Sequence, residues 1–325
     1  MNLDKIYEKA SSNIVLSEAE SMYLIDTKDE DTFTLLSYAE KLRYQYKSNK
    51  IHLCSIINAK SGKCSENCSF CAQSAHHNAK ETPIYPLNSS DEMISYAKEC
   101  EDNMKTTCFS VVTSGKGINK AEELNEIAAT LSHIKKTTNM NRCVSLGVLD
   151  RESIKALKDA GLSRLHHNLE TAESYFPNIC TTHTYQDRLN TLKLAKEAGL
   201  QVCSGGIFGL GESLEQRVEL GMLLRELEVN SVPINILNPI PGTPLEKQPI
   251  MKPLEALRLV ATYRFMLPYA DIGIFGGREL ALGSLQPLMF IAGANQTLIG
   301  NYLITEGQTP EKDLQMIKDL GLEVG

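Results

Sequence analysis

The sequence contains no long apolar segment. No run of 18 apolar residues occurs among its 325 residues, and the first twenty, MNLDKIYEKASSNIVLSEAE, show no basic start followed by an apolar stretch. A membrane-spanning helix needs about 20 predominantly apolar residues, and a secretory signal needs a charged start and an apolar centre. We therefore expect no membrane association, and we place the protein in the cytoplasm.

An excess of basic residues is also missing. The chain has 33 Lys and Arg against 40 Asp and Glu, which gives a formal net charge of −7, and it contains no tryptophan. Proteins that bind nucleic acid usually concentrate Lys and Arg on one face or along one helix. No stretch of Lys and Arg interleaved with aromatic residues occurs here, so the composition argues against a nucleic-acid partner and against an anionic membrane surface.

Cysteine, in contrast, is abundant, with nine in the chain. The cytoplasm keeps thiols reduced, and a chain of this length does not need disulfides to stabilise its core. The cysteines therefore indicate metal or redox chemistry.

Short apolar segments alternate with helical stretches from residue 51 onward. The segments are IHLCSIIN, TCFSVVT, RCVSLGV, RLHHNLE, QVCSGGI, VPINILN, DIGIFGG and NQTLIG, and the helical runs between them are 91–103, 120–138, 151–160, 185–198, 212–228 and 253–266. Roughly eight strand and helix units predict an α/β fold, a (β/α)8 barrel of the TIM type, rather than an open doubly wound sheet. We expect residues 1–48 to form an N-terminal helical extension, in which Ser17 and Glu20 cap a helix, and residues 49–325 to form the barrel with a C-terminal segment.

Three cysteines are closely spaced in KCSENCSFCAQS, residues 63–74: Cys64, Cys68 and Cys71. They belong to the long loop 59–88 after the first predicted strand, and in such barrels the loops at the C-terminal ends of the strands carry the active site. Structural zinc sites and most iron–sulfur clusters take four protein ligands. The triplet predicts either a zinc site whose fourth ligand lies elsewhere, or a cluster with one position open to a ligand that is not protein.

The triplet, with Phe70 before its last cysteine, resembles the motif of the radical SAM enzymes. In that superfamily a CxxxCxxC loop holds a 4Fe–4S cluster whose open iron chelates S-adenosylmethionine. The segment GGIFGLGE, residues 205–212, is similar to one that lies against the cofactor there. Its four glycines would allow a close backbone approach to a ligand, and the alternative is a turn between a strand and a helix.

From about residue 50 onward the chain resembles the biotin synthase family. The resemblance rests on SGKCSENCSFCAQS, HHNLET, TTHTYQDRL, VCSGGIFGLGE, VPINILNPIPGTPL, GGRE and FIAGAN, in that order. It implies insertion of sulfur into dethiobiotin. Reductive cleavage of S-adenosylmethionine gives a 5′-deoxyadenosyl radical that takes hydrogen from an unactivated carbon, and an auxiliary iron–sulfur cluster supplies the sulfur. A flavodoxin- or ferredoxin-type electron donor and a homodimer are also implied.

The same resemblance implies binding residues. At the cofactor it places Phe70, Asn168, Glu170, Arg188, Gly206 and Ile207, with Arg188 at the methionyl carboxylate, and at dethiobiotin it places Asn168 and Asn235. An amide both donates and accepts hydrogen bonds, which suits the cyclic urea of dethiobiotin. From the residues alone, His166, Asn168 and Glu170 share one face of the fourth predicted strand and could equally form a satisfied polar network. The alternatives are a related radical SAM barrel with another substrate, such as a maturase or methylornithine synthase, and a non-catalytic iron–sulfur or zinc protein.

Four further cysteines each lie within a predicted strand: Cys54, Cys108, Cys143 and Cys203. Any one of them alone would more often be a small core residue. Side chains from four strands converge only inside the barrel, so together they predict a second cluster site. Cys100, on a predicted outer helix, and Cys180, on the loop after the fourth strand, are given no role, and His76 and His77 are interpreted as loop residues.

One position departs from the family pattern. The better-known biotin synthases hold a 2Fe–2S auxiliary cluster with three strand cysteines and one arginine, and the resemblance matches Cys108, Cys143 and Cys203 to the three cysteines. Counting back from GGRE, Gly273 occupies the position of the arginine, and Cys54 stands where a serine is usual. We expect Cys54 to serve as the replacement ligand and the auxiliary cluster to contain four irons.

Overall fold

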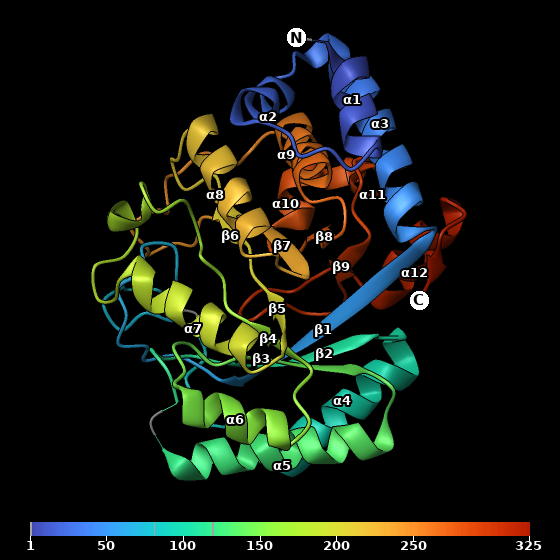
Figure 1. Cartoon of the computed structure of the whole chain (residues 1–325). Coiled ribbons are helices and arrows are strands. Elements are labelled where there is room, and N and C mark those ends of the chain that lie inside the picture. Colours follow the sequence, from blue (N-terminus) through green and yellow to red (C-terminus); the bar gives the residue numbers. More distant parts are fainter. Residues whose placement is uncertain (1, 81, 119) are drawn as a thin grey trace.

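A ring of parallel strands forms the centre of the molecule (Figure 1). Within residues 2–80, 82–118 and 120–325, which the computed structural model describes, the strands make a ten-stranded sheet in the order β10-β1-β2-β3-β4-β5-β7-β6, with β8 paired to β7 and β9 paired to β1. Their bounds are β1 (Lys50–Lys60), β2 (Cys108–Thr113), β3 (Asn141–Ser145), β4 (Arg164–His166), β5 (Gln201–Cys203), β6 (Gly206–Phe208), β7 (Ser231–Ile236), β8 (Asp271–Ile274), β9 (Gln296–Leu298) and β10 (Glu323–Val324). The parallel arrangement brings the carboxyl ends of the ring strands to one mouth, where sites form in barrels.

An irregular seam closes the ring between β8 and β9. The backbone N–H of Asn295 donates to the Ile272 carbonyl at 2.8 Å, and the Asn295 side chain accepts from the Ile272 N–H at 2.9 Å. A Cβ on Gly273 would lie 1.8 Å from the backbone oxygen of Gln296, far inside contact distance. The two strands can therefore approach this closely only because residue 273 is glycine.

Six helices follow the ring strands and cover the outside of the barrel. They are α4 (Ser90–Met104), α5 (Ala121–Thr137), α6 (Arg151–Asp159), α7 (Tyr185–Glu197), α8 (Leu214–Glu226) and α9 (Pro253–Met266). Capping boxes begin α4, α7 and α8 at Ser89, Thr184 and Ser213, where side chains satisfy N–H groups that the first helical turn leaves free. α7 begins at the point where the chain returns to the barrel mouth, which positions residues of its first turns for the site.

The N-terminal helices α1 (Leu3–Ser11), α2 (Glu18–Ile25) and α3 (Thr32–Lys47) pack on the barrel beside α9, and α2 also contacts α8 (Figure 1). Ser17 and Glu20 form the predicted capping box of α2. Leu35 and Leu42 of α3 are fully buried, and they belong to the same hydrophobic core as the barrel strands. The predicted boundary at residue 48 therefore falls at the end of α3, between two parts of one core.

The C-terminal segment returns to the first strand. It contains α10 (Arg278–Leu282), α11 (Leu288–Ile291) and α12 (Pro310–Asp319), and β10 pairs with the start of β1. Single turns of 3₁₀-helix occur at η1 (Asp29–Asp31), η2 (Phe176–Asn178) and η3 (Gly283–Leu285). In the described part of the chain, no helix combines the length and the apolar character needed to cross a membrane.

The predicted α/β barrel is confirmed, since each of the eight predicted segments overlaps a strand of the ring. Two strand predictions are wrong in detail. The fourth segment, 164–170, contains β4 only as far as His166; beyond it Glu170, with φ 70°, makes only an isolated parallel bridge to Gly206. The fifth is interrupted, so that β5 and β6 are separate short strands on either side of Ser204 and Gly205.

Candidate active site at the barrel mouth

Backbone hydrogen bonds hold the loop of Cys64, Cys68 and Cys71 in one shape. The Cys64 N–H donates to the Gln73 carbonyl at 2.9 Å, the Ala75 N–H donates to the Cys64 carbonyl at 2.8 Å, and the Cys71 N–H donates to the Cys68 carbonyl at 3.0 Å. The loop follows β1, as the sequence predicts, and the three cysteines line one cavity of about 200 Å³ at the mouth. Three sulfur ligands on one cavity wall fit a cluster that lacks a fourth protein ligand.

Burial raises the pKa of the Cys71 thiol to about 11. A metal ligand must be a thiolate, so metal binding at this site releases protons that the free thiols hold at neutral pH. The loop is thus shaped in advance for a metal, while the Cys71 sulfur stays protonated without one.

Arg188, Glu170 and Asn168 line the same cavity. Arg188 Nη1 donates to the Asn168 carbonyl at 2.7 Å and to Glu170 Oε1 at 3.3 Å, whereas its Nη2 makes no hydrogen bond with the described residues. Burial raises the pKa of Glu170, and Arg188 opposes this effect. Within the described chain the buried Glu170 Oε2 also has no hydrogen-bond partner. A free guanidinium edge and an unpaired carboxylate oxygen in one cavity fit a ligand that carries both a carboxylate and hydroxyl groups.

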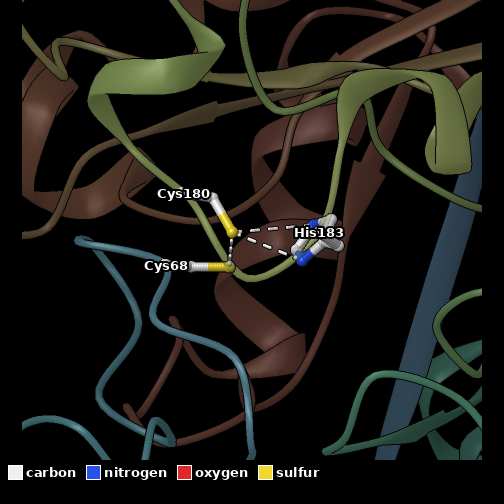
Figure 2. A group of neighbouring side chains, drawn as sticks. All are labelled: Cys68, Cys180 and His183. Carbon is white, nitrogen blue, oxygen red and sulfur yellow. Dashed lines mark hydrogen bonds between the residues drawn. The ribbon is translucent and has the colours of Figure 1, made fainter.

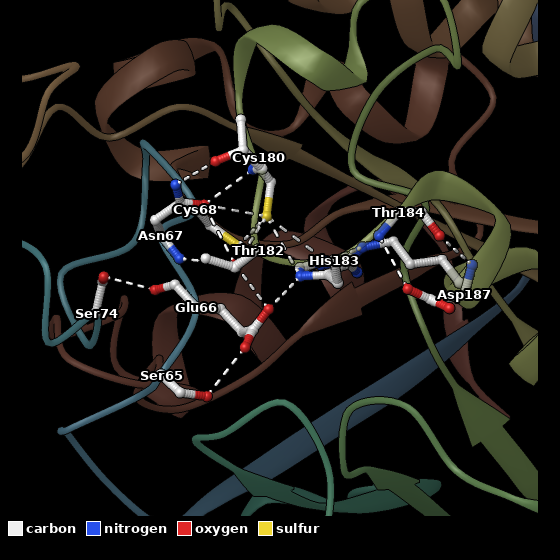
Figure 3. Close-up of polar contacts among 12 residues, drawn as sticks. Ser65, Glu66, Asn67, Cys68, Ser74, Cys180, Thr182, His183, Thr184 and Asp187 are labelled. Carbon is white, nitrogen blue, oxygen red and sulfur yellow. Dashed lines mark hydrogen bonds and ion pairs between the residues drawn. The ribbon is translucent and has the colours of Figure 1, made fainter.

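The structure also places three residues against the triplet that sequence reasoning missed: Glu66, Cys180 and His183. Figure 2 shows Cys180 between Cys68 and His183, with 3.7 Å between the Cys68 and Cys180 sulfurs and 3.3 Å from Cys180 Sγ to His183 Nδ1. The His183 ring lies 2.5 Å from Glu66 Oε2 in the wider network of Figure 3. The only signal in the sequence was the spacing of Cys180 and His183, three residues apart, within the segment before α7.

His183 connects this network to Arg188. The Arg188 Nε–H donates to His183 Nε2 at 3.0 Å, so the ring proton is assigned to Nδ1, which donates to Glu66. The Phe176 ring packs on both side chains, 5.7 Å from the Arg188 guanidinium carbon. The cysteine loop and the first turns of α7 are therefore linked through one imidazole.

A second, central cavity of about 360 Å³ is lined by all four in-strand cysteines: Cys54, Cys108, Cys143 and Cys203. The strand register explains their convergence, since Cys54 pairs directly with Cys108 across β1 and β2, and Cys143 lies on the neighbouring β3. All four are at most 8% exposed. The structure thus brings together the second cysteine set that the strand positions indicated.

The surroundings of this set are polar on one side. His166 Nδ1 lies 3.3 Å from Cys203 Sγ, and the Cys203 thiol donates to Ser231 Oγ at 3.4 Å. Burial lowers the pKa of His166 to about 4, so its ring is neutral at physiological pH. Arg164, in register with Cys143, also lines the cavity, and the nearby cysteines raise its pKa although burial opposes them. A cationic side chain beside four sulfurs suits an anionic metal cluster.

The two cavities adjoin. Both are lined by Phe70, Val112, Ser145, His166, Asn168, Glu170 and Leu303. The two cavities therefore share part of their walls, with the triplet lining one cavity and the in-strand cysteines lining the other.

Asn235 lies near the end of β7, and it lines the central cavity. Its Nδ2 donates to the Gly206 carbonyl at 3.3 Å, and its Oδ1 accepts from the Gly276 N–H at 2.9 Å. Both ends of the amide thus already have backbone partners. Because a carbonyl oxygen has two lone pairs, Oδ1 retains the capacity for one more hydrogen bond.

The first two glycines of GGIFGLGE, Gly205 and Gly206, are required by close backbone contacts. A Cβ on Gly205 would lie 2.0 Å from the Pro233 carbonyl oxygen, and one on Gly206 would lie 2.5 Å from the Glu170 carbonyl oxygen. Gly206 lines neither cavity, whereas the adjacent Ile207 lines the central one. Close contact between strands, rather than a ligand, explains the first two glycines.

Comparisons with known proteins agree with this geometry. The Radical SAM superfamily matches residues 59–224, and the Biotin and Thiamin Synthesis associated domain matches residues 233–323. The crystal structure of methylornithine synthase has a similar fold, with a TM-score of 0.85 and 19% identity over 98% of this chain and 97% of that one. A FeFe-hydrogenase maturase from Carboxydothermus hydrogenoformans is also similar, with a TM-score of 0.81 and 18% identity over 98% of this chain and 78% of that one.

The barrel and the cysteine triplet at its mouth define a radical SAM enzyme. Proteins named biotin synthase are 49% identical to this chain in Geotalea uraniireducens, over 94% of this chain and 93% of the relative, and 49% identical in Geobacter sulfurreducens, over 96% and 94%. The chain belongs to the biotin synthase family.

Proposed function

We propose that the chain converts dethiobiotin to biotin by radical insertion of sulfur, with S-adenosylmethionine as co-substrate and an auxiliary cluster as the sulfur source. The observation that carries this proposal is the pair of adjoining cavities, one lined by the triplet and the other by four in-strand cysteines. A barrel that only cleaved S-adenosylmethionine would need the first cavity but not the second set of sulfurs.

In this proposal Cys64, Cys68 and Cys71 hold a 4Fe–4S cluster. Such a cluster, when bound, would supply the electron for reductive cleavage of S-adenosylmethionine to the 5′-deoxyadenosyl radical. The chain binds and orients the co-substrate. Arg188 offers its free Nη2 to the methionyl carboxylate, and Glu170 accepts a ribose hydroxyl at the buried oxygen that has no partner in the described chain. Phe70 and Ile207 add apolar contacts, and Gly206 acts by letting its strand approach Glu170.

Dethiobiotin would occupy the central cavity. Asn168 Oδ1 accepts from the Gly205 N–H at 3.1 Å, which leaves its NH₂ group as the end that can donate to the urea carbonyl. Asn235 would accept a urea N–H at Oδ1, in addition to its bond from Gly276.

For the auxiliary site we propose a cluster of four irons held by Cys54, Cys108, Cys143 and Cys203. Two features support this ligand set: the direct pairing of Cys54 with Cys108, and the lack of room for any side chain at residue 273. The Arg164 guanidinium beside the cavity would balance part of the negative charge of an all-thiolate cluster.

The remaining expectations belong to the same proposal. A flavodoxin- or ferredoxin-type protein would supply electrons, the enzyme would work in the cytoplasm, and two copies would form a homodimer. We also propose that residues 1–48 act as an extension of the barrel formed by residues 49–325.

Alanine at any one of Cys64, Cys68 or Cys71 should abolish 5′-deoxyadenosine formation, because a cubane cluster held by two thiolates has lost one of its three iron attachments. The measurement is chromatography of the nucleoside after reduction with dithionite. Cys100→Ala, at a buried cysteine on α4, is the matched control. A single triplet variant that still formed 5′-deoxyadenosine at the control's rate would contradict the assignment. Iron and sulfide analysis with Mössbauer spectra on the same samples tests the auxiliary cluster.

A further inference from the structure

Cys180 belongs to neither cysteine set, yet its sulfur lies against a member of the triplet. The Cys68 and Cys180 sulfurs are 3.7 Å apart, and the two residues are 8% and 4% exposed. Figure 2 shows the two side chains meeting from opposite loops, one after β1 and the other before α7. Cys180 has no role in the function proposed above.

The neighbours of the two cysteines are bonded to each other. The Ser69 N–H donates to the Ile179 carbonyl at 2.8 Å, and the Thr181 N–H donates to Asn67 Oδ1 at 2.9 Å. Figure 3 shows Asn67 reaching toward the segment that carries Cys180. Because these bonds join residues next to both cysteines, the fold holds the two sulfurs face to face.

We propose that Cys68 and Cys180 form a disulfide when the protein has lost its cluster, and that this disulfide prevents reassembly until it is reduced. The second half rests on the proposed function, in which Cys68 is a cluster ligand. Two thiols give up two protons and two electrons to an oxidant of the disulfide or diazene class. One S–S bond forms, and the oxidant leaves as two thiols or as a hydrazine.

The geometry supports each step. Cys68 lines the cavity at the mouth, so a small oxidant can reach it, and Cys180 is positioned to displace the oxidant from the Cys68 sulfur. The sulfurs need to close from 3.7 Å to about 2.05 Å to form the bond. With Cys68 in the disulfide, only Cys64 and Cys71 of the triplet would remain to hold iron.

The first test uses the full chain, stripped of iron anaerobically and treated with diamide. Tryptic digestion without reductant should yield residues 64–80 linked to residues 165–188. Cys64 and Cys71 lie on the same peptide as Cys68, so fragment ions are needed to assign the bond. They should locate it at Cys68. The absence of this cross-link in the unaltered chain would overturn the proposal.

The second test follows cluster uptake after the same treatment, on addition of ferrous iron and sulfide. The readout is the change that S-adenosylmethionine causes in the electron paramagnetic resonance signal of the reduced cluster, which reports the triplet site. The oxidised unaltered chain should lack this signal until dithiothreitol is added. Cys180→Ser should take up the cluster without reductant, whereas Cys100→Ser should behave like the unaltered chain.

If cluster uptake by Cys180→Ser were lost after diamide treatment as fully as in the unaltered chain, the proposal that the disulfide blocks reassembly would be overturned. If instead the fully reduced chain showed no signal that responds to S-adenosylmethionine, the triplet assignment would fail. Mass spectrometry would still detect the cross-link independently of the cluster. Failure of the disulfide proposal can therefore be distinguished from failure of the triplet assignment.

Discussion

Cys54 lies directly opposite Cys108 in the pairing of β1 with β2, and both line the central cavity. Serine keeps the size of the side chain but removes the thiolate that binds iron. Cys54→Ser should therefore lose auxiliary iron and biotin formation while it retains S-adenosylmethionine cleavage. Iron and sulfide counts, biotin assay and 5′-deoxyadenosine assay measure the three effects. If the unaltered enzyme held only two auxiliary irons and Cys54→Ser made biotin normally, Cys54 would be a core residue.

Asn235 offers one further hydrogen bond to a ligand in the central cavity. A buried hydrogen bond left unmade costs roughly 1–3 kcal/mol, so Asn235→Ala should weaken dethiobiotin binding by about one to two decades. Titration calorimetry gives the dissociation constant. Asn238→Ala, at another amide that lines the cavity, is the control. An unchanged dissociation constant in Asn235→Ala would remove this residue from the substrate site.

At the scale of elements, the seam between β8 and β9 depends on Gly273. A methyl group there would meet the Gln296 carbonyl at 1.8 Å, so the strands must separate. We expect Gly273→Ala to lower the free energy of unfolding by about 1–3 kcal/mol, the usual cost of overpacking, measured by urea denaturation. Gly321→Ala is the uncrowded control, because its Cβ would meet nothing within 4 Å; since Gly321 has positive φ, whereas Gly273 does not, its loss of stability measures backbone strain alone. If Gly273→Ala lowered the free energy of unfolding by no more than Gly321→Ala does, β8 and β9 would be able to separate without the expected cost.

The helices of the barrel were predictable because their signals are local. Apolar spacing and capping residues give α4 to α9 to within two residues of their observed bounds. The end of β4 was not predictable, because beyond His166 the pairing depends on a segment distant in sequence: Glu170 makes only an isolated bridge to Gly206, and its carbonyl accepts from the Ile207 N–H at 2.7 Å. The same holds for Gly205, whose neighbour Pro233 lies on another strand.

The candidate site divides in the same way. The close spacing of the triplet was visible in the sequence, and the two-residue period of strands allowed the convergence of the four in-strand cysteines to be predicted. Cys180 and His183 were missed because their contacts depend on two loops that meet only in the folded molecule. The two hydrogen bonds of the Asn235 amide with Gly206 and Gly276 could not be predicted for the same reason.

At the scale of the whole molecule, the N-terminal helices share the barrel's core. Leu35 and Leu42 are fully buried beside α9, which is itself almost entirely buried. Deleting residues 1–48 would expose this apolar face, so we expect the remaining chain to lose cooperative thermal unfolding and to bind a hydrophobic dye. Circular dichroism and dye fluorescence test this, with the full chain as reference. A cooperatively folded fragment that held both clusters would show that the barrel is an independent domain.

The close contact between Gly273 and Gln296 also limits how the ligand set proposed for the auxiliary site can evolve. An arginine at position 273 does not fit the present seam, because even its Cβ would lie 1.8 Å from the backbone oxygen of Gln296 on β9. A lineage with this seam must first move β9 outward, and that intermediate would carry the loss of stability without yet gaining a ligand. Under the proposed ligand set, loss of Cys54 would therefore find no replacement ligand at residue 273 unless β9 had first moved.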